Sequence, residues 1–162
     1  MTAPMYFRRP DRSLLKLDFA TVQNLLRFVQ DDGIKPEAGG VLMGRLLRGS
    51  KNVVVDEITE PLAGDVRTRF TFKRAAEAHQ SILDTRWAES RGTCGYLGEW
   101  HTHAERRPSP SSVDLEDWRR RLRSDKFDVD HLFFVIVGTE DVCVWQGTRG
   151  RKGLQQLVRE PL

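Results

Sequence analysis

The sequence lacks the features of a secreted, membrane-spanning or disulfide-stabilised protein. Its 162 residues include only two cysteines, Cys94 and Cys143, which lie far apart and form no Cys-x-x-Cys pattern. The longest apolar run, Leu132 to Val137, has six residues, whereas a membrane-spanning helix needs about 20. The N-terminal residues contain no apolar core of a secretory signal. We therefore expect a cytoplasmic protein with two buried, reduced thiols.

Motifs for nucleotide and nucleic-acid binding are also missing. There is no G-x-G-x-x-G sequence, no phosphate-binding loop, no zinc-finger spacing and no aromatic RNA-recognition pattern. The net charge is only +3, and residues 106–126 carry a local excess of basic side chains that includes Arg119, Arg120, Arg121 and Arg123. We interpret this stretch as a solvated helix face, with an acidic partner or a phosphate backbone as the alternative.

The composition and length are those of one folded domain, residues 1–162. Hydrophobic residues make up 39% and charged residues 30% of the chain, too apolar for disorder and too polar for a membrane protein. A chain of this size buries enough surface to fold without disulfides.

The hydrophobic pattern alternates between strand-like and helix-like segments. Asp18 is the expected N-cap of a first helix, Gly33 its stop, and Ser111 opens the third helix. We expect helices at 19–30, 75–90 and 111–123, and strands at 13–17, 39–47, 52–59, 67–72, 92–103, 131–137, 142–145 and 153–158. This order predicts an α/β (α+β) fold in which helices flank a mixed β-sheet.

The residues with the clearest chemistry are His101, His103 and Asp114. Side chains two residues apart on a strand share a face, so the two imidazoles project together. If Ser111 caps the next helix, Asp114 is its third residue and points back over the helix start toward the strand end. Two imidazoles and one carboxylate are a three-ligand set for Zn²⁺ with an open fourth position, as in catalytic zinc sites. The alternative is structural: polar loop-edge histidines and a Ser-x-x-Asp helix cap.

A hydrolase with such a site also needs a general base, and two glutamates compete for that role. Glu99 lies two residues before His101 on the same strand face, whereas Glu37 precedes the glycine-rich strand at 39–47. The residues alone do not choose between them. We interpret His79 as a surface or core-packing residue and His131 as a packing residue, with a supporting role near the site as the alternative for His131. Glutamates 60, 105 and 116 are interpreted as solvated charges.

With these residues in view, the chain resembles the JAMM (MPN⁺, JAB-domain) metallopeptidases. The resemblance rests on Glu37 before the sequence GGVLMG, then on His101-Thr102-His103, seven residues, and Ser111-x-x-Asp114. It implies an MPN/JAB-like fold, Zn²⁺ held by His101, His103 and Asp114, Glu37 as the base, and Ser111 as the donor to the oxyanion. Ala104 departs from the proline that is common after the second histidine in the family, and it implies altered loop stiffness.

Within the family, the GEWHTH sequence, Trp118 and the short length resemble a bacterial subgroup. These are JAB-domain peptidases encoded beside E1–E2-like conjugation proteins in antiviral CBASS operons. The resemblance implies an isopeptidase that cuts at the C-terminus of a conjugated cGAS-like nucleotidyltransferase and so removes it from its targets. The alternatives are a processing peptidase for a ubiquitin-like or sulfur-carrier precursor, a non-catalytic MPN-like scaffold, and a nucleic-acid-associated domain.

Overall fold

The computed structural model describes residues 3–127 and 129–162. The helices in these ranges are α1 (Phe19–Leu26), α2 (Ala76–Glu89) and α3 (Ser112–Ser124). The strands are β1 (Met5–Arg8), β2 (Leu14–Leu17), β3 (Gly39–Leu46), β4 (Val53–Ile58), β5 (Val66–Arg67), β6 (Phe72–Lys73), β7 (Gly95–Thr102), β8 (His131–Val137), β9 (Val142–Thr148), β10 (Leu154–Gln156) and β11 (Val158–Glu160). None of the helices in the described ranges is long and apolar enough to cross a membrane.

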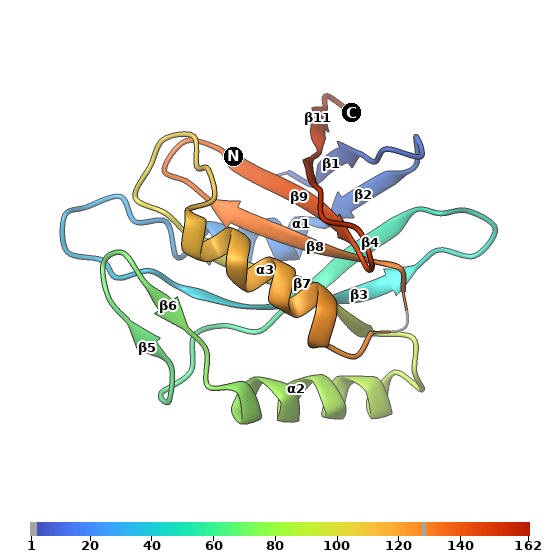
Figure 1. The fold of residues 1–162 in the computed structure, drawn as a ribbon, viewed down its shortest axis with the longest axis horizontal. Coiled ribbons are helices and arrows are strands. Elements are labelled where there is room, and N and C mark those ends of the chain that lie inside the picture. Colours follow the sequence, from blue (N-terminus) through green and yellow to red (C-terminus); the bar gives the residue numbers. More distant parts are fainter. Residues whose placement is uncertain (1–2, 128) are drawn as a thin grey trace.

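One large mixed sheet carries most of the chain. Among the described residues, its strand order is β10-β9-β8-β7-β3-β4-β2-β1-β11, while β5 and β6 pair only with each other. The pairs β2–β4 and β7–β8 are parallel and the other neighbours are antiparallel. The two end strands, β10 and β11, are separated in the sequence by Leu157 alone, so the sheet curls back on itself (Figure 1). The expected α/β fold with a mixed sheet and flanking helices is confirmed.

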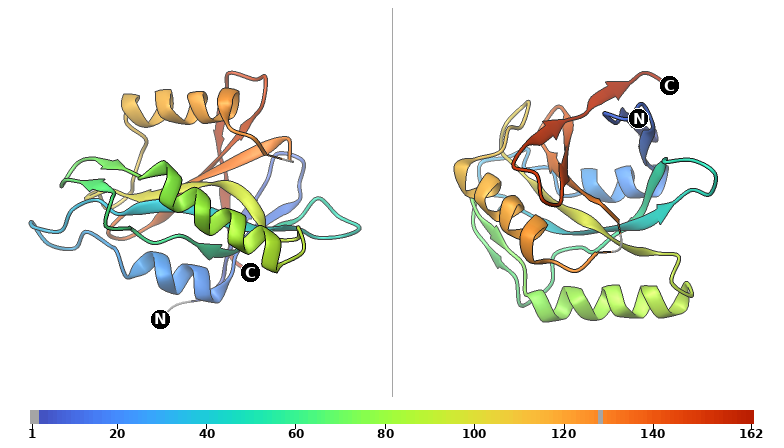
Figure 2. Two further views of the ribbon diagram at one scale, coloured as in Figure 1. Left: turned by 90° about the horizontal axis from the view of Figure 1, so that it is seen from below. Right: turned by 45° about the vertical axis from the view of Figure 1, so that its right-hand side comes forward.

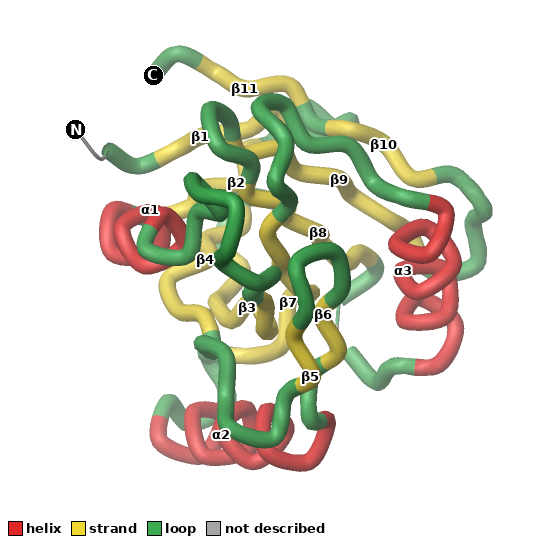
Figure 3. Tube along the Cα trace, turned by 90° about the vertical axis from the view of Figure 1, so that its left-hand side faces the viewer, coloured by secondary structure: helices red, strands yellow, loops and turns green. Residues whose placement is uncertain are grey.

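The central strands are apolar throughout because both of their faces are buried. Along β8, Phe133, Val135 and Val137 join the core that α1 covers, while Leu132, Phe134 and Ile136 join the core under α3. This is the period-two alternation of a strand, distributed between two cores. Figures 2 and 3 show α1 and α3 on opposite sides of the sheet, with α2 across the β3–β7 region.

Trp118 anchors α3 on the sheet. It is 1% exposed, stacks on Phe134 with ring centroids 4.7 Å apart, and contacts Trp145. Because Trp118 follows Asp114 by one helical turn, this packing also fixes the start of α3 relative to β7.

Several elements differ from the sequence expectation. The strand expected at 67–72 is instead a hairpin, with β5 and β6 joined by a turn in which the amide of Thr68 donates to the carbonyl of Thr71. The strand expected at 153–158 is two strands, one at each end of the sheet. Helix α1 ends at Leu26 rather than near Gly33, and β1 is an additional strand. Both cysteines are free and buried, as predicted.

The close approach of β3 to β4 requires glycine at position 40. A Cβ there would lie 2.2 Å from the carbonyl oxygen of Thr59, which belongs to the backbone and has little room to move. We expect Gly40→Ala to lower the free energy of unfolding by about 1–3 kcal/mol, the usual cost of overpacking. The matched control is Gly33→Ala, since a Cβ at Gly33 meets nothing within 4 Å. Urea denaturation of both variants checks this, and equal losses in the two would contradict it.

Candidate active site

Strand β7 presents Glu99 and His101 to the α3 side of the sheet because of a bulge at Gly98. Gly98 has φ of +139°, and a Cβ there would lie 1.8 Å from the carbonyl oxygen of Phe133. The β3–β7 register shifts at this point. Leu97 and Trp100, three residues apart, therefore both enter the α1-side core, which leaves Glu99 and His101 on the other face.

The start of α3 brings Asp114 to the two histidines. Ser111 is the N-cap, and its side chain accepts from the amide of Asp114 at 3.1 Å, while Asp114 Oδ2 accepts from the amide of Ser111 at 2.8 Å. The helix-cap interpretation of Ser111 and Asp114 is therefore correct. The same Oδ2 atom also lies 3.3 Å from His101 Nε2 and 3.1 Å from His103 Nε2.

Three potential ligand atoms thus converge from two elements. The Nε2 atoms of His101 and His103 are 3.0 Å apart, which closes a triangle with Asp114 Oδ2. Tetrahedral zinc with bonds of about 2.0–2.1 Å separates its ligand atoms by about 3.3 Å, so the donor types and spacing fit Zn²⁺. The cap and ligand interpretations describe the same geometry, since one carboxylate oxygen makes both sets of contacts.

Hydrogen bonding orients the second histidine. His103 Nδ1 lies 2.6 Å from Glu105 Oε1, which favours the tautomer with hydrogen on Nδ1 and a lone pair on Nε2. Burial acts to lower the pKa of His103, but hydrogen bonds to Asp114 and Glu105 raise it overall. Glu105 is therefore more than a solvated charge, contrary to the sequence interpretation. The sequence feature that could have identified this contact is the position of Glu105 two residues after His103.

Glu37 lies beside this cluster, two residues before the neighbouring strand β3 begins. Gly39 pairs with His101, and a carboxylate oxygen of Glu37 lies within 4.8 Å of ligand nitrogens of both His101 and His103. Its backbone is fixed by the β5–β6 hairpin: the amide donates to the carbonyl of Thr68 at 2.7 Å, and Arg67 Nε donates to the carbonyl of Glu37 at 2.8 Å.

The carboxylates of Glu37 and Asp114 have opposite electrostatic environments. Glu37 is 6% exposed, and burial raises its pKa to about 7 despite the nearby histidines. Burial also acts to raise the pKa of Asp114, but hydrogen bonds from His101 and His103 hold it well below its usual range. Near neutral pH, Asp114 is therefore a permanent anion, while Glu37 can exchange a proton.

Glu99 does not join the histidine cluster. It is 8% exposed, forms an ion pair with Arg74 Nη1, and lies 3.6 Å from Arg121 Nε. The basic stretch on α3 is therefore divided. Arg121 is directed to Glu99, whereas Arg119, Arg120 and Arg123 are exposed.

The predicted site residues line one cavity. Its volume is about 810 Å³, and its wall includes Glu37, His101, His103, Ser111 and Asp114. Two exposed apolar side chains also line it, Phe70 from the β5–β6 turn and Val113 from the start of α3. The structure therefore brings all five predicted residues to one opening.

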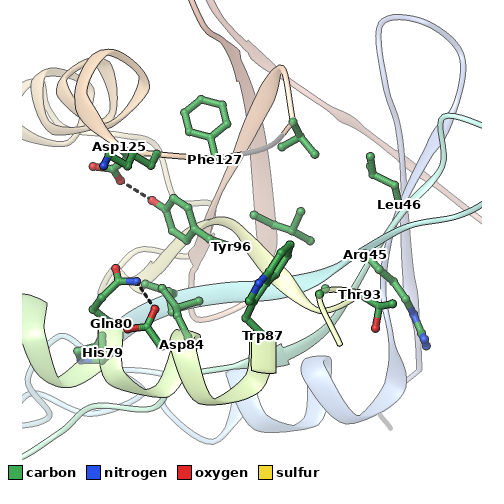
Figure 4. A pocket seen from close by; sticks show the side chains of 18 of the residues that line it. Arg45, Leu46, His79, Gln80, Asp84, Trp87, Thr93, Tyr96, Asp125 and Phe127 are labelled. Carbon is green, nitrogen blue, oxygen red and sulfur yellow. Dashed lines mark hydrogen bonds between the residues drawn. The ribbon is translucent and has the colours of Figure 1, made fainter. Parts of the chain in front are cut away.

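A second cavity of about 1080 Å³ lies between α2 and the sheet and contains none of these five residues. Figure 4 shows Trp87, Tyr96 and Phe127 around it, with Tyr96 Oη donating to Asp125 at 2.8 Å. Arg74 and Arg121 line both cavities, so their ion cluster with Glu99 lies at the junction.

Buried hydrogen-bonded side chains behind the site were not identified from the sequence. His79 is fully buried, with Nδ1 2.6 Å from Thr59 Oγ1 and Nε2 3.0 Å from both carboxylate oxygens of Asp65. Gln30 forms a second buried cluster with Thr102. His79 is thus a hydrogen-bonded core residue, and His131 bonds to Thr148 Oγ1 at 3.0 Å, away from the site. No local sequence pattern marks such long-range partners.

The curled mixed sheet with His101, His103 and Asp114 at one opening suits a metal-assisted hydrolase. The family model for prokaryotic homologs of the JAB domain matches residues 20–148. The chain therefore belongs to the family of prokaryotic homologs of the JAB domain, and the resemblance drawn from the motif is confirmed.

Known relatives share a common name. A Vibrio cholerae serotype O1 protein named CD-NTase/cGAS isopeptidase is 40% identical over 131 residues, covering 81% of this chain and 79% of that protein. A Pseudomonas aeruginosa protein of the same name is 37% identical over 128 residues, covering 79% of each chain. The solution structure of a Desulfitobacterium hafniense protein matches with a TM-score of 0.60 at 15% identity, over 86% of this chain and 87% of that one. This last similarity supports the fold alone.

The buried carboxyl of Glu37 makes stability depend on pH. The pKa of Glu37 in the folded chain is about 7, above the ordinary value of 4.5. Between these pH values the folded state binds the proton more tightly than the unfolded state, so the free energy of unfolding falls as the pH rises. In the presence of a metal chelator, we compare the free energy of unfolding of Glu37→Gln with that of the parent chain. We expect the difference, variant minus parent, to be about 2 kcal/mol larger at pH 8 than at pH 5. Urea denaturation at both pH values measures this.

The control for this experiment is Glu116→Gln, at an exposed position on α3. Its stability difference from the parent chain should be the same at pH 5 and pH 8. A pH-independent difference for Glu37→Gln as well would show that burial does not raise the pKa of Glu37.

Proposed function

We propose that the protein is a zinc-dependent isopeptidase that removes a C-terminally conjugated protein from its targets. The conjugated protein would be a cGAS-like nucleotidyltransferase of a bacterial antiviral CBASS system, in line with the names of the relatives. The observation that carries the proposal is the convergence of His101, His103 and Asp114 beside the buried carboxyl of Glu37.

In this proposal, His101, His103 and Asp114 hold the metal. When bound, Zn²⁺ supplies Lewis acidity, which lowers the pKa of a coordinated water and polarises a carbonyl group. The contact of His103 with Glu105 and the contact of Asp114 with the Ser111 amide hold two of the three ligands in orientation.

The chain's own residues then move the proton and stabilise charge. Glu37 takes a proton from the attacking water as the water oxygen bonds to the isopeptide carbonyl carbon. Glu37 then delivers this proton to the leaving lysine nitrogen as the C–N bond breaks. Without metal, burial raises the pKa of Glu37 to about 7, and the positive charge of a bound Zn²⁺ would lower it, which favours the carboxylate that takes the proton from water. Ser111 is exposed at the cavity wall, and its hydroxyl donates to the oxyanion of the tetrahedral intermediate.

The substrate side of the proposal has two forms. Deconjugation and the processing of a ubiquitin-like or sulfur-carrier precursor both present a C-terminal tail to the same cavity, and the relatives' names favour deconjugation. The test uses the C-terminal tails of the proteins encoded by neighbouring genes. Each tail is joined to a reporter either through the reporter's N-terminus or through a lysine side chain, and the relative cleavage rates distinguish deconjugation from processing. Faster cleavage of the lysine-linked reporter supports the isopeptidase.

Metal content tests the ligand set. We expect about one Zn²⁺ per chain in protein purified without chelator, loss of cleavage on chelation, and recovery with zinc. His101→Ala leaves two ligands and should abolish zinc binding rather than only slow turnover. His131→Gln, at a histidine away from the site, is the control and should keep its zinc. Absence of zinc from the parent chain, or full zinc in His101→Ala, contradicts the assignment.

Alanine substitutions of the two glutamates, Glu37 and Glu99, should affect different properties of the protein. Glu37→Ala should keep zinc and fold but lower kcat by at least about 100-fold, the lower end for loss of a general base. Glu99→Ala leaves Arg74 and Arg121 without their buried partner, so it should lower stability. The measurements are zinc content, melting temperature and kcat on one substrate. If Glu99→Ala keeps stability and zinc but loses kcat, while Glu37→Ala stays active, the two roles are reversed.

A further inference from the structure

The side chain of Gln30 is an unusual feature behind the candidate site. It lies in the loop after α1, is 2% exposed, and uses both ends of its amide. Oε1 accepts from Thr102 Oγ1 at 2.8 Å, and Nε2 donates to the carbonyls of Lys35 at 3.1 Å and Arg69 at 2.9 Å. Burying an amide is costly unless it is hydrogen-bonded, so these three contacts fix its position.

Gln30 is connected to the chain on both sides of Glu37, directly through Lys35 and by way of Thr102 through Ala38. Lys35 precedes Glu37 by two residues, and Ala38 follows it. Thr102 Oγ1, which donates to Gln30, accepts from the Ala38 amide at 3.0 Å, and the Thr102 amide donates to the Ala38 carbonyl at 2.9 Å. Gln30 thus connects the chain on both sides of Glu37 to Thr102, the residue between the two histidines.

The third partner connects the β5–β6 hairpin to the same point. Within the described residues, this hairpin has no strand pairing to the main sheet. Its residues Arg67 and Thr68 hold the backbone of Glu37, and Arg69 receives the hydrogen bond from Gln30. Arg69 Nη1 also donates to the Lys35 carbonyl at 3.2 Å. The two hydrogen bonds described for the Glu37 backbone therefore come from the hairpin that Gln30 contacts at Arg69.

We propose that Gln30 is a positioning residue, which sets Glu37 relative to His101 and His103 without touching the reacting atoms. A general base must lie within about 2.6–3.2 Å of the proton it takes, and a displacement of about 1 Å can cost about 100-fold in rate. Glu37 precedes β3, so sheet pairing alone does not place it. The inference rests on the proposed role of Glu37 as the base.

The principal variant is Gln30→Met, which keeps side-chain length but removes all three hydrogen bonds. We expect kcat to fall by about 10-fold or more, with KM within about threefold and zinc content unchanged. Gln23→Met, at an exposed glutamine of α1, is the matched control and should leave kcat unchanged. Thr102→Val replaces the hydroxyl by a methyl group and should lower kcat in the same way. Thr102→Ser keeps the hydroxyl and should keep most of the parent kcat.

A double-mutant cycle separates positioning from general stability. If Gln30 acts through Glu37, then Gln30→Met should lower kcat by less than about twofold further in a Glu37→Gln background. An equal loss in both backgrounds, or no loss in the parent chain, overturns the proposal. If Glu37→Gln alone leaves kcat intact, the proposed function fails instead, and the exchange experiment below still tests Gln30.

Amide hydrogen exchange of the metal-free protein gives a readout that does not depend on activity. Gln30→Met should speed exchange at the amides of Glu37 and Thr102, which bond to Thr68 and Ala38, by about 10-fold or more. Exchange in the β8–β9 pair, such as Val135 opposite Val144, should stay near the parent rate. A uniform rise across the chain, or no change at Glu37, contradicts a local positioning role.

Discussion

The antiparallel pairing of β3 with β7 is the constraint on which the candidate site depends. It places Gly39 opposite His101, and therefore carries Glu37 to the edge where the two histidines project. The strands come this close because position 39 is glycine; a Cβ there would lie 2.8 Å from the carbonyl oxygen of Trp100. The Gly98 bulge then decides which face of β7 carries the histidines. The positions of the histidines and of Glu37 therefore depend on backbone geometry that only glycine allows.

Asp114 links the folding of a helix to the assembly of the site. One of its oxygens satisfies the Ser111 amide at the start of α3 and also faces both histidines. Glu37, which lies beside the same two histidines, has a pKa shifted in the opposite direction. Two carboxyl groups whose environments separate their pKa values are a common basis for assigning one as a fixed anion and the other as a proton carrier. The separation arises from partners: Asp114 has several hydrogen-bond donors, whereas Glu37 is mainly desolvated.

Local patterns in the sequence predicted the parts of this structure that local physics determines. The Asp18 and Ser111 caps and the strands β3, β4 and β8 follow from residue type and spacing. The positions of His101, His103, Ser111 and Asp114 in one cavity also agree with spacing, although their roles stay predictions. The choice between Glu37 and Glu99 required tertiary contacts, since only the structure shows Arg74 and Arg121 directed to Glu99. Gln30 was missed for the same reason, because its partner Thr102 is 72 residues away.

The curled sheet has a consequence for how the chain reaches its native state. Strand β1 pairs with β11, so Arg8 and Glu160 form a contact across 152 residues of sequence. Closing so long a loop carries an entropic cost that must be met before the contact stabilises anything. Topologies rich in such distant pairings fold slowly, because local segments cannot complete the core alone. The central strands have nearer partners, so we expect β3, β4, β7 and β8 to assemble first and the β1–β11 seam to close late. The seam is then the region through which the folded chain opens most readily.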